Sequence, residues 1–319
     1  MRITVLRTLS NSCVPIYDWL HNIATIDEII YDQGGHLGGK AYNFALLPAE
    51  VNDLNPDWVL MLGQCDLHGA PCPPDDVLKS IHSRHKLVHL CCDGSAPDWF
   101  PQIERYRNIF DLQINIDGVA VGPFAKHGMT TLCPIDPAKF NVVGTPWIER
   151  PISLGFRGGY GLDRRTDARS KAIFPLVEAG LVHAELRLRP DQMPPTHDGF
   201  YDEYCTFMTQ CKCIWNHAGS GNCMEEKEGD NMHVKARVLE AAFAGCVLFE
   251  NAWSPTRHWF GPDIDYYIPY TSVDDIKDGL RWVQENPEDA EDLSQGFRKT
   301  AQKYSAEKFW NRVIASVAV

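Results

Sequence analysis

Short apolar runs alternate with segments of helical period along the first half of the chain. The runs at 57–62 and 87–92 are almost wholly apolar, which is typical of strands buried on both faces of a parallel sheet. Shorter strand patterns occur at 1–7, 28–31 and 112–116. Helical patterns cover 14–23, 41–54, 75–85 and 99–107. This alternation predicts βαβ units with right-handed crossovers.

The alternation stops at 134–151 and then resumes. Four prolines fall in that stretch without a clear period, which predicts an interdomain linker. Later strands are predicted at 152–156, 184–188, 213–215, 247–249 and 266–268, and helices at 166–179, 201–210, 233–244, 272–285, 289–302 and 306–316. The sequence therefore predicts an α/β protein with one domain over 1–149, a second over 150–302, and a last helix within 303–319.

Composition narrows the class of protein. A chain of 319 residues suits two domains, and its 44% hydrophobic and 23% charged residues are ordinary for a globular protein. No run approaches the roughly 18 apolar residues of a membrane span, and the N-terminus does not resemble a signal peptide. The 11 cysteines are odd in number and scattered, which favours a reducing compartment. We expect a cytoplasmic protein without integral membrane association.

Net charge bears on the partners. The formal charge of −12 disfavours binding to nucleic acid, although it does not exclude it. A phosphate-bearing ligand would need a local basic cleft. The segment 233–250, HVKARVLEAAFAGCVLFE, is the strongest candidate for ligand chemistry.

Three polar residues stand out on the predicted helix in this segment. His233, Arg237 and Glu240 fall within about 60° of one another at helical spacing, on a helix otherwise apolar enough to be buried. The stripe either faces a cleft or contains an i,i+3 ion pair between Arg237 and Glu240. With Asp230 or Asn231 as N-cap, the helix start and its Lys235 and Arg237 would suit a pyrophosphate.

A glycine-rich turn is the second candidate. Gly158, Gly159 and Tyr160 follow a predicted strand and precede a helix, so a ligand could approach the backbone closely. Arg164 and the next arginine could bind phosphate, or could be a solvated pair at a helix start.

The motif K-x-R-x-x-E-A-x-x-x-G over 235–245, followed by an apolar strand, resembles the donor-binding helix of GT-B glycosyltransferases. It is most similar to the CgeB-like, glycosyltransferase family 1-like group. The resemblance extends to 153–158, 212–217 and 259–270, and is weaker over 1–149.

The resemblance implies two Rossmann-like domains facing a cleft, with the C-terminal helix crossing back, and transfer of a hexose or pentose from a nucleotide sugar. Glu240 would bind the donor ribose, and Lys235 and Arg237 the diphosphate. The remaining donor-site candidates are Gly158, Gly159, Tyr160, Arg164, Asn216, His217 and His233. No metal or other cofactor is implied. Met232 replaces the first glutamate of the retaining E-x7-E pattern, so the stereochemical outcome stays open.

Inverting transfer needs a base for the acceptor proton. Asp93 directly follows an apolar strand, where ligands bind in α/β sheets, although it could instead cap a helix. His36, on a glycine-rich loop, is a second candidate.

Other patterns in the chain are less informative. His82, His85 and His89 have metal-like spacing but straddle a helix end and a strand, so no metal site is expected. The acceptor could be a glycan, a small molecule, a protein or a modified base of viral DNA. A nucleotide-sugar epimerase and a non-catalytic sugar-binding protein on the same fold remain alternatives.

Overall fold

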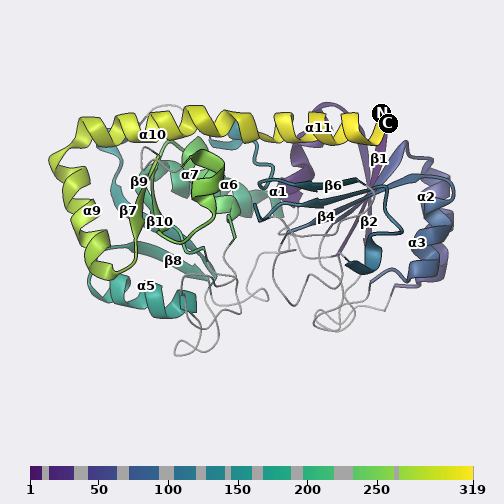
Figure 1. The fold of residues 1–319 in the computed structure, drawn as a ribbon, viewed down its shortest axis with the longest axis horizontal. Helices are drawn as coiled ribbons and strands as arrows, with labels where there is room; N and C mark the ends of the chain where they lie inside the picture. The colour runs from purple at the N-terminus through teal and green to yellow at the C-terminus, as the bar shows by residue number, and fades with distance from the viewer. Residues whose placement is uncertain are drawn as a thin grey trace. The chain divides into compact units, whose positions relative to one another are not determined.

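The computed structural model describes residues 1–8, 14–31, 42–62, 72–92, 104–119, 127–140, 145–159, 168–187, 197–218, 233–261 and 266–318 (Figure 1). The chain forms two compact units. Unit 1 comprises Met1–Pro134 and Ala306–Val319, and unit 2 comprises Ile135–Ser305. These boundaries differ from the predicted ones at 149/150 and 302/303. Residues 135–149, expected to end the first domain, and residues 303–305, expected to begin the last segment, belong to unit 2.

Unit 1 is built on a six-stranded parallel sheet with the order β2-β1-β3-β4-β5-β6. The strands are β1 (Arg2–Thr8), β2 (Thr25–Tyr31), β3 (Trp58–Leu62), β4 (Lys86–Cys91), β5 (Leu112–Asn115) and β6 (His127–Thr130). The helices are α1 (Val14–Tyr17), α2 (Leu47–Leu54), α3 (Asp75–His82) and α11 (Ala306–Ala318), with 3₁₀ turns η2 (Asp18–Asn22) and η3 (Phe44–Leu46). The helix expected over 14–23 is thus a single α-turn followed by a 3₁₀ turn, and β6 was not predicted.

The core of unit 1 lies between the sheet and its helices. Leu6, Met61 and Leu87 on the strands pack in one buried cluster with Val51 of α2 and Leu78 of α3. The almost wholly apolar run predicted at 57–62 therefore supplies a central strand, with all five residues of β3 buried.

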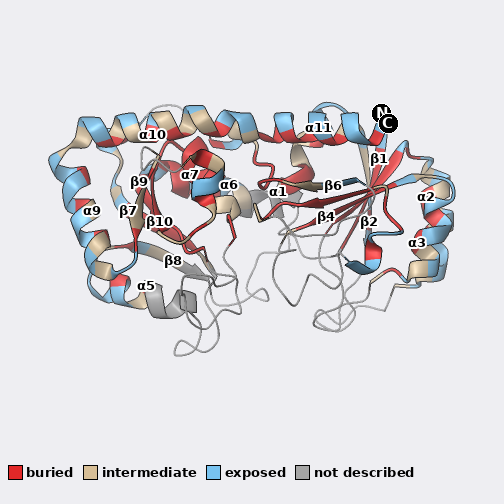
Figure 2. Cartoon of the chain, viewed as in Figure 1, coloured by how far each residue is buried: buried red, intermediate tan, exposed pale blue. Residues whose placement is uncertain are grey.

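The C-terminal helix α11 packs within unit 1. Its buried residues lie along one side of the helix (Figure 2), among them Phe309 and Trp310. Trp310 Nε1 donates to Ile16 O at 3.1 Å, and Lys86 Nζ donates to Val317 O at 2.6 Å. The ammonium group lies at the C-terminal end of the helix, where the negative end of the helix dipole stabilises a positive charge.

Unit 2 is built on a five-stranded parallel sheet with the order β11-β10-β9-β7-β8. The strands are β7 (Ile152–Gly159), β8 (His183–Arg187), β9 (Cys211–Trp215), β10 (Val247–Asn251) and β11 (Tyr267–Tyr270). The helices are α5 (Ala168–Glu178), α6 (His197–Gln210), α7 (Ala236–Phe243), α8 (Thr256–Phe260), α9 (Val273–Glu285) and α10 (Pro287–Ala301). The 3₁₀ turns are η4 (Pro137–Phe140), η5 (Trp147–Glu149) and η7 (Gln302–Tyr304).

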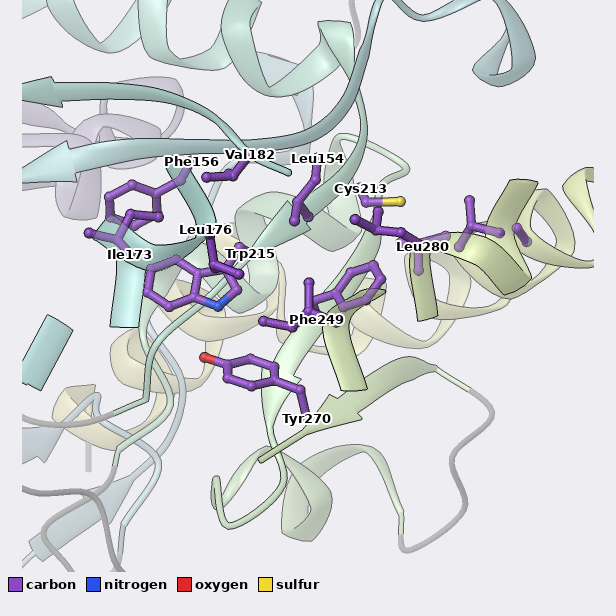
Figure 3. Close-up of a cluster of buried hydrophobic side chains, with 14 of the residues drawn as sticks. Leu154, Phe156, Ile173, Leu176, Val182, Cys213, Trp215, Phe249, Tyr270 and Leu280 are labelled. Carbon is purple, nitrogen blue, oxygen red and sulfur yellow. The ribbon is translucent and has the colours of Figure 1, made fainter. Parts of the chain in front are cut away.

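Aromatic residues fill the core of unit 2 near the ends of its central strands. Phe156 of β7 packs edge-to-face on Trp215 of β9, with ring centroids 5.1 Å apart (Figure 3). Tyr270 of β11 packs on the same tryptophan, and Phe249 of β10 joins the cluster. Because these side chains are buried from several strands at once, they fix the spacing of β7, β9 and β10.

Both sheets are doubly wound. In each unit the first strand lies between the second and the third, so the strand order reverses between β1 and β3 in unit 1 and between β7 and β9 in unit 2. The predicted fold class, an α/β protein of two Rossmann-like domains, is confirmed. In such sheets ligands bind beyond the carboxyl ends of the strands at the reversal, which defines where to look for a site.

Two glycines inside helices of unit 2 test how tightly this core is packed. A Cβ added at Gly279 of α9 would lie 2.6 Å from Phe249 Cε1 and 2.9 Å from Ile268 Cγ2, whereas one at Gly296 of α10 would meet nothing within 4 Å. We expect Gly279→Ala to lower the free energy of unfolding by about 1–3 kcal/mol. Gly296→Ala should raise it by about 0.5–1 kcal/mol through helix propensity. Equal effects in urea denaturation would contradict this packing.

Candidate functional site

The candidate site lies at the reversal of strand order in unit 2. Arg157 and Gly158 lie in the last three residues of β7, which ends at Gly159, and Asn216 and His217 follow β9 directly. Helix α7, which carries Arg237, begins beside them. The segments 160–167 and 219–232, which follow β7 and Ala218 in the sequence, are outside the described residues.

The guanidinium group of Arg237 joins the two strands. Nη2 donates to the backbone oxygen of Arg157 at 2.8 Å, and Nη1 donates to Asn216 Oδ1 at 3.3 Å. The guanidinium carbon lies 4.6 Å from the centroid of the Phe156 ring, which places the cation on an aromatic side chain. Nε is buried without a hydrogen-bond partner. Within the part of the chain that the structure describes, no carboxylate forms an ion pair with Arg237.

Gly158 makes room for this arrangement. A Cβ at this position would lie 2.9 Å from Arg237 Nη2 and 3.0 Å from Phe156 Cζ. A side chain here would therefore push the guanidinium group away from β7. The predicted importance of a glycine at the strand end has a specific cause here, which is the close approach of an arginine to the backbone.

Asn216 connects Arg237 to a buried carboxylate. Its Nδ2 donates to Glu250 Oε2 at 2.7 Å, while its Oδ1 accepts from Arg237. Thr256 Oγ1 donates to Glu250 Oε1 at 3.2 Å. Asn216 and Glu250 are both 0% exposed. Sequence reasoning missed Glu250, although a lone acidic residue near the end of the apolar run 247–249 was a usable signal.

Glu240 has a different environment from the one its spacing suggested. Tyr204 donates to Oε2 at 2.7 Å and Tyr201 to Oε1 at 3.3 Å, both from α6. The i,i+3 ion pair with Arg237, considered as an alternative from the sequence, is absent among the described contacts of Glu240. Burial raises the pKa of the Glu240 carboxyl group above the usual 4.5, although the tyrosine hydrogen bonds and the charge of Arg237 act in the opposite direction.

The start of α7 differs from the predicted one. The helix begins at Ala236 with Lys235 as N-cap, and no side chain caps it, so the expected start at His233 with a cap at Asp230 or Asn231 is wrong. His233 consequently precedes the helix and does not share its stripe with Arg237 and Glu240. It is buried and hydrogen-bonded to Lys235 Nζ. His217, also buried, packs on Trp215.

Arg150, which the sequence did not single out, holds α7 from its other end. Nη2 donates to Ala244 O at 2.9 Å, and Nη1 donates to Gly245 O at 3.0 Å and to Cys211 O at 2.8 Å. The guanidinium group therefore binds carbonyl groups at the C-terminus of α7 and at the start of β9. The charge also suits the negative end of the helix dipole. This contact fixes the helix that carries Arg237 and Glu240.

Four predicted site residues, Asp93, His36, Tyr160 and Arg164, lie outside the described residues. Gly159 is the last residue of β7. The proposed roles of these five residues stay predictions.

The histidines with metal-like spacing have separate partners. His82 contacts Asp111, His85 contacts Pro56 O and Asn52, and His89 packs between Tyr106 and Phe110. Over the described ranges, no group of three or more potential metal ligands occurs.

The cysteines and the helices bear on the predicted compartment. Seven described cysteines are free thiols: Cys91, Cys92, Cys133, Cys205, Cys211, Cys213 and Cys246. Cys72 is disulfide-bonded, so the described residues contain an exception to the expected reduced state. No described helix is long and apolar enough to cross a membrane.

Unit 2 is thus a doubly wound, Rossmann-like domain with a guanidinium group held at the reversal of its strand order. Residues 194–315 match the family described as "Glycosyl transferase-like", and this range includes α7, Asn216 and Glu250. No curated protein matches the sequence.

Solved structures match over the whole chain. Anabaena Alr3699/HepE in complex with UDP-glucose has a TM-score of 0.63 at 10% identity, covering 100% of this chain and 99% of that one. Sucrose-phosphate synthase from Thermosynechococcus elongatus has a TM-score of 0.58 at 11% identity, covering 99% and 100%. A glycosyltransferase from Rickettsia africae has a TM-score of 0.55 at 9% identity, covering 99% and 98%.

The fold is that of the GT-B glycosyltransferases, and the resemblance to the glycosyltransferase family 1-like group is confirmed. At these identities the structural matches establish the fold alone. The family match covers the part of unit 2 where Arg237, Asn216 and Glu250 meet.

The raised pKa of Glu240 predicts a pH dependence of stability. Below pH 4.5 the carboxyl group is protonated in both states, whereas above it the unfolded chain ionises first, which favours unfolding. The free energy of unfolding of the wild type should therefore fall relative to Glu240→Gln as pH rises from 4.5 through the folded pKa. Tyr204→Phe, which removes a hydrogen bond favouring the carboxylate, should extend this fall to higher pH. A constant difference between wild type and Glu240→Gln in denaturation from pH 4 to 8 would contradict it.

Proposed function

We propose that this protein is a glycosyltransferase that transfers a hexose or pentose from a nucleotide sugar to an acceptor, with the donor held by unit 2. The observation that carries the proposal is Arg237, a guanidinium group held at the strand-order reversal without an ion-pair partner among the described residues. A cation whose position is set by the backbone, an amide and an aromatic ring is pre-organised to bind a diphosphate.

The donor contacts follow from the same geometry. Arg237 has five N–H groups and uses two in the described hydrogen bonds, so others remain for phosphate oxygens. Gly158 leaves the end of β7 open, and Lys235 adds a second positive charge before α7. We also propose Tyr160, Arg164, His217 and His233 as donor contacts. His217 follows β9 and His233 precedes α7, whereas Tyr160 and Arg164 are proposed from their place after β7 in the sequence.

Glu240 is the proposed ligand of the donor ribose. A carboxylate has about four acceptor positions, and the tyrosines occupy one on each oxygen. The two hydrogen bonds would hold the carboxylate in one orientation, and the remaining positions would accept from ribose hydroxyls.

In the reaction, an acceptor oxygen forms a bond to the anomeric carbon as the bond from that carbon to the diphosphate breaks. The negative charge that develops on the leaving diphosphate is neutralised by Arg237 and Lys235, which stabilises the transition state without a metal ion. If the outcome is inverting, the acceptor proton passes to Asp93 or His36. We propose a cytoplasmic location and leave glycan, small molecule and protein as acceptor classes, with nucleic acid disfavoured by the charge of −12.

The first test is nucleotide binding to wild type, Arg237→Ala and Arg281→Ala. Arg281 is a matched control, because it is an exposed arginine of unit 2 paired with Asp278 on α9. Charged hydrogen bonds contribute about 1.5–3 kcal/mol, so Arg237→Ala should weaken the affinity about 10- to 100-fold, and Arg281→Ala should leave it unchanged.

Calorimetry with UDP, GDP, ADP, CMP and dTDP measures this affinity and identifies the nucleobase. Uridine nucleotides come first, because the similar HepE was solved with UDP and UDP-glucose. No binding of any nucleotide by the wild type would overturn the proposal. Binding followed by donor hydrolysis or epimerisation without an acceptor would favour an epimerase.

Gly158→Ala tests the approach of Arg237 to β7. The added methyl group meets the end of a long side chain, which can move, so we expect a loss of stability below about 1 kcal/mol. The displaced guanidinium group should nevertheless weaken nucleotide binding on the order of tenfold. A variant with unchanged affinity in the same calorimetry would show that the described position of Arg237 does not matter for the ligand.

A further inference from the structure

A buried carboxylate stands behind the proposed diphosphate site. Glu250 is at the carboxyl end of β10, is 0% exposed, and accepts hydrogen bonds from Asn216 Nδ2 and Thr256 Oγ1. Asn216 in turn accepts from Arg237. Glu250, Asn216 and Arg237 therefore form a chain of hydrogen bonds from β10 through the end of β9 to α7.

The important property of this chain of hydrogen bonds is which group donates and which accepts at each step. A side-chain amide donates at one end and accepts at the other, and the two ends have nearly the same shape. An ionised carboxylate only accepts, and a guanidinium group only donates. With Glu250 on one side and Arg237 on the other, Asn216 has one satisfactory orientation, with Nδ2 toward Glu250 and Oδ1 toward Arg237.

The backbone of Asn216 is held just as firmly. Its N–H donates to Phe249 O at 2.9 Å, and its carbonyl oxygen accepts from Tyr270 OH at 2.6 Å. Backbone and side chain are thus both fixed, and the described contacts occupy both ends of the amide. Through its contact with Arg237, Asn216 can act on a ligand without touching it.

We propose that Glu250 is a positioning residue for the donor diphosphate: it sets the orientation of the Asn216 amide, and that amide holds Arg237 in place. The inference rests on the proposed function, because it assigns Glu250 a role in the same site. Glu250 acts without touching the donor, so its effect must pass through Asn216.

Exchanging the amide of Asn216 and the carboxylate of Glu250 tests the direction of these hydrogen bonds. Asn216→Asp places a second carboxylate against Glu250 in a buried site, which is unfavourable. Adding Glu250→Gln restores a complementary pair, because the new amide on β10 can donate to the new carboxylate after β9 and still accept from Thr256. Glu250→Gln alone can keep the wild-type orientation, since its oxygen can face Asn216.

We expect the dissociation constant for UDP, or for whichever nucleotide the wild type binds, to rise on the order of tenfold in Asn216→Asp and to change less than about threefold in Glu250→Gln. The double variant should recover at least half of the logarithmic loss. Val247→Ala is the control, because it removes core contacts from β10 away from this chain. It should lower the melting temperature and leave the dissociation constant unchanged.

The outcomes separate the two proposals. A wild type that binds no nucleotide overturns the proposed function and this inference with it. If the wild type binds but the double variant binds as weakly as Asn216→Asp, or the two substitutions act additively, the positioning role of Glu250 is wrong and the donor site stands. If affinity follows melting temperature across all four variants, Glu250 is structural only, which also overturns the inference.

Discussion

The contact of Arg237 with the ends of β7 and β9 is the interaction on which the candidate site depends. A guanidinium group could not lie there unless Gly158 lacked a side chain, Phe156 offered a ring face and the Arg157 carbonyl pointed at it. Asn216 supplies the remaining acceptor and is itself oriented by Glu250. Each of these features contributes to the position of the cation. Residues from β7, α7 and β10, and the residue that follows β9, therefore form one connected group of contacts.

The second requirement is a fixed helix. Arg150 binds the carbonyl groups at the C-terminal end of α7, and Glu240 ties the middle of the helix to Tyr201 and Tyr204 of α6. Both contacts are partly buried and use charged groups, so their geometry is costly to change. They place the first turn of α7, where Arg237 lies, within a narrow range of positions. The GT-B fold thus supplies the edge of the sheet, and local contacts supply the precision.

Much of the fold could be predicted because its signals are local. The apolar run that became β3 is buried at every position, and Ser272 with Asp275 forms the capping box that begins α9. The errors have equally physical causes. Strand β6 has the sequence HGMT and no apolar run, because it lies at a sheet edge. Helix α7 begins at Ala236, later than predicted. The residues before it continue the helical pattern of apolar and polar positions, but Lys235 has an extended backbone conformation.

The sequence by itself determined the alternation of strands and helices, the GT-B resemblance, and Arg237 with Gly158 as candidates, because periodicity, glycine placement and motif spacing are properties of the chain. Only the tertiary structure decided which groups these residues meet. The spacing of Arg237 and Glu240 permitted an ion pair, yet Glu240 meets two tyrosines that lie 36 and 39 residues earlier in the chain. Glu250 was one acidic residue among 42 in the sequence. Its burial beside Asn216 arises from the parallel pairing of β9 with β10, a contact between residues distant in sequence that no local pattern encodes.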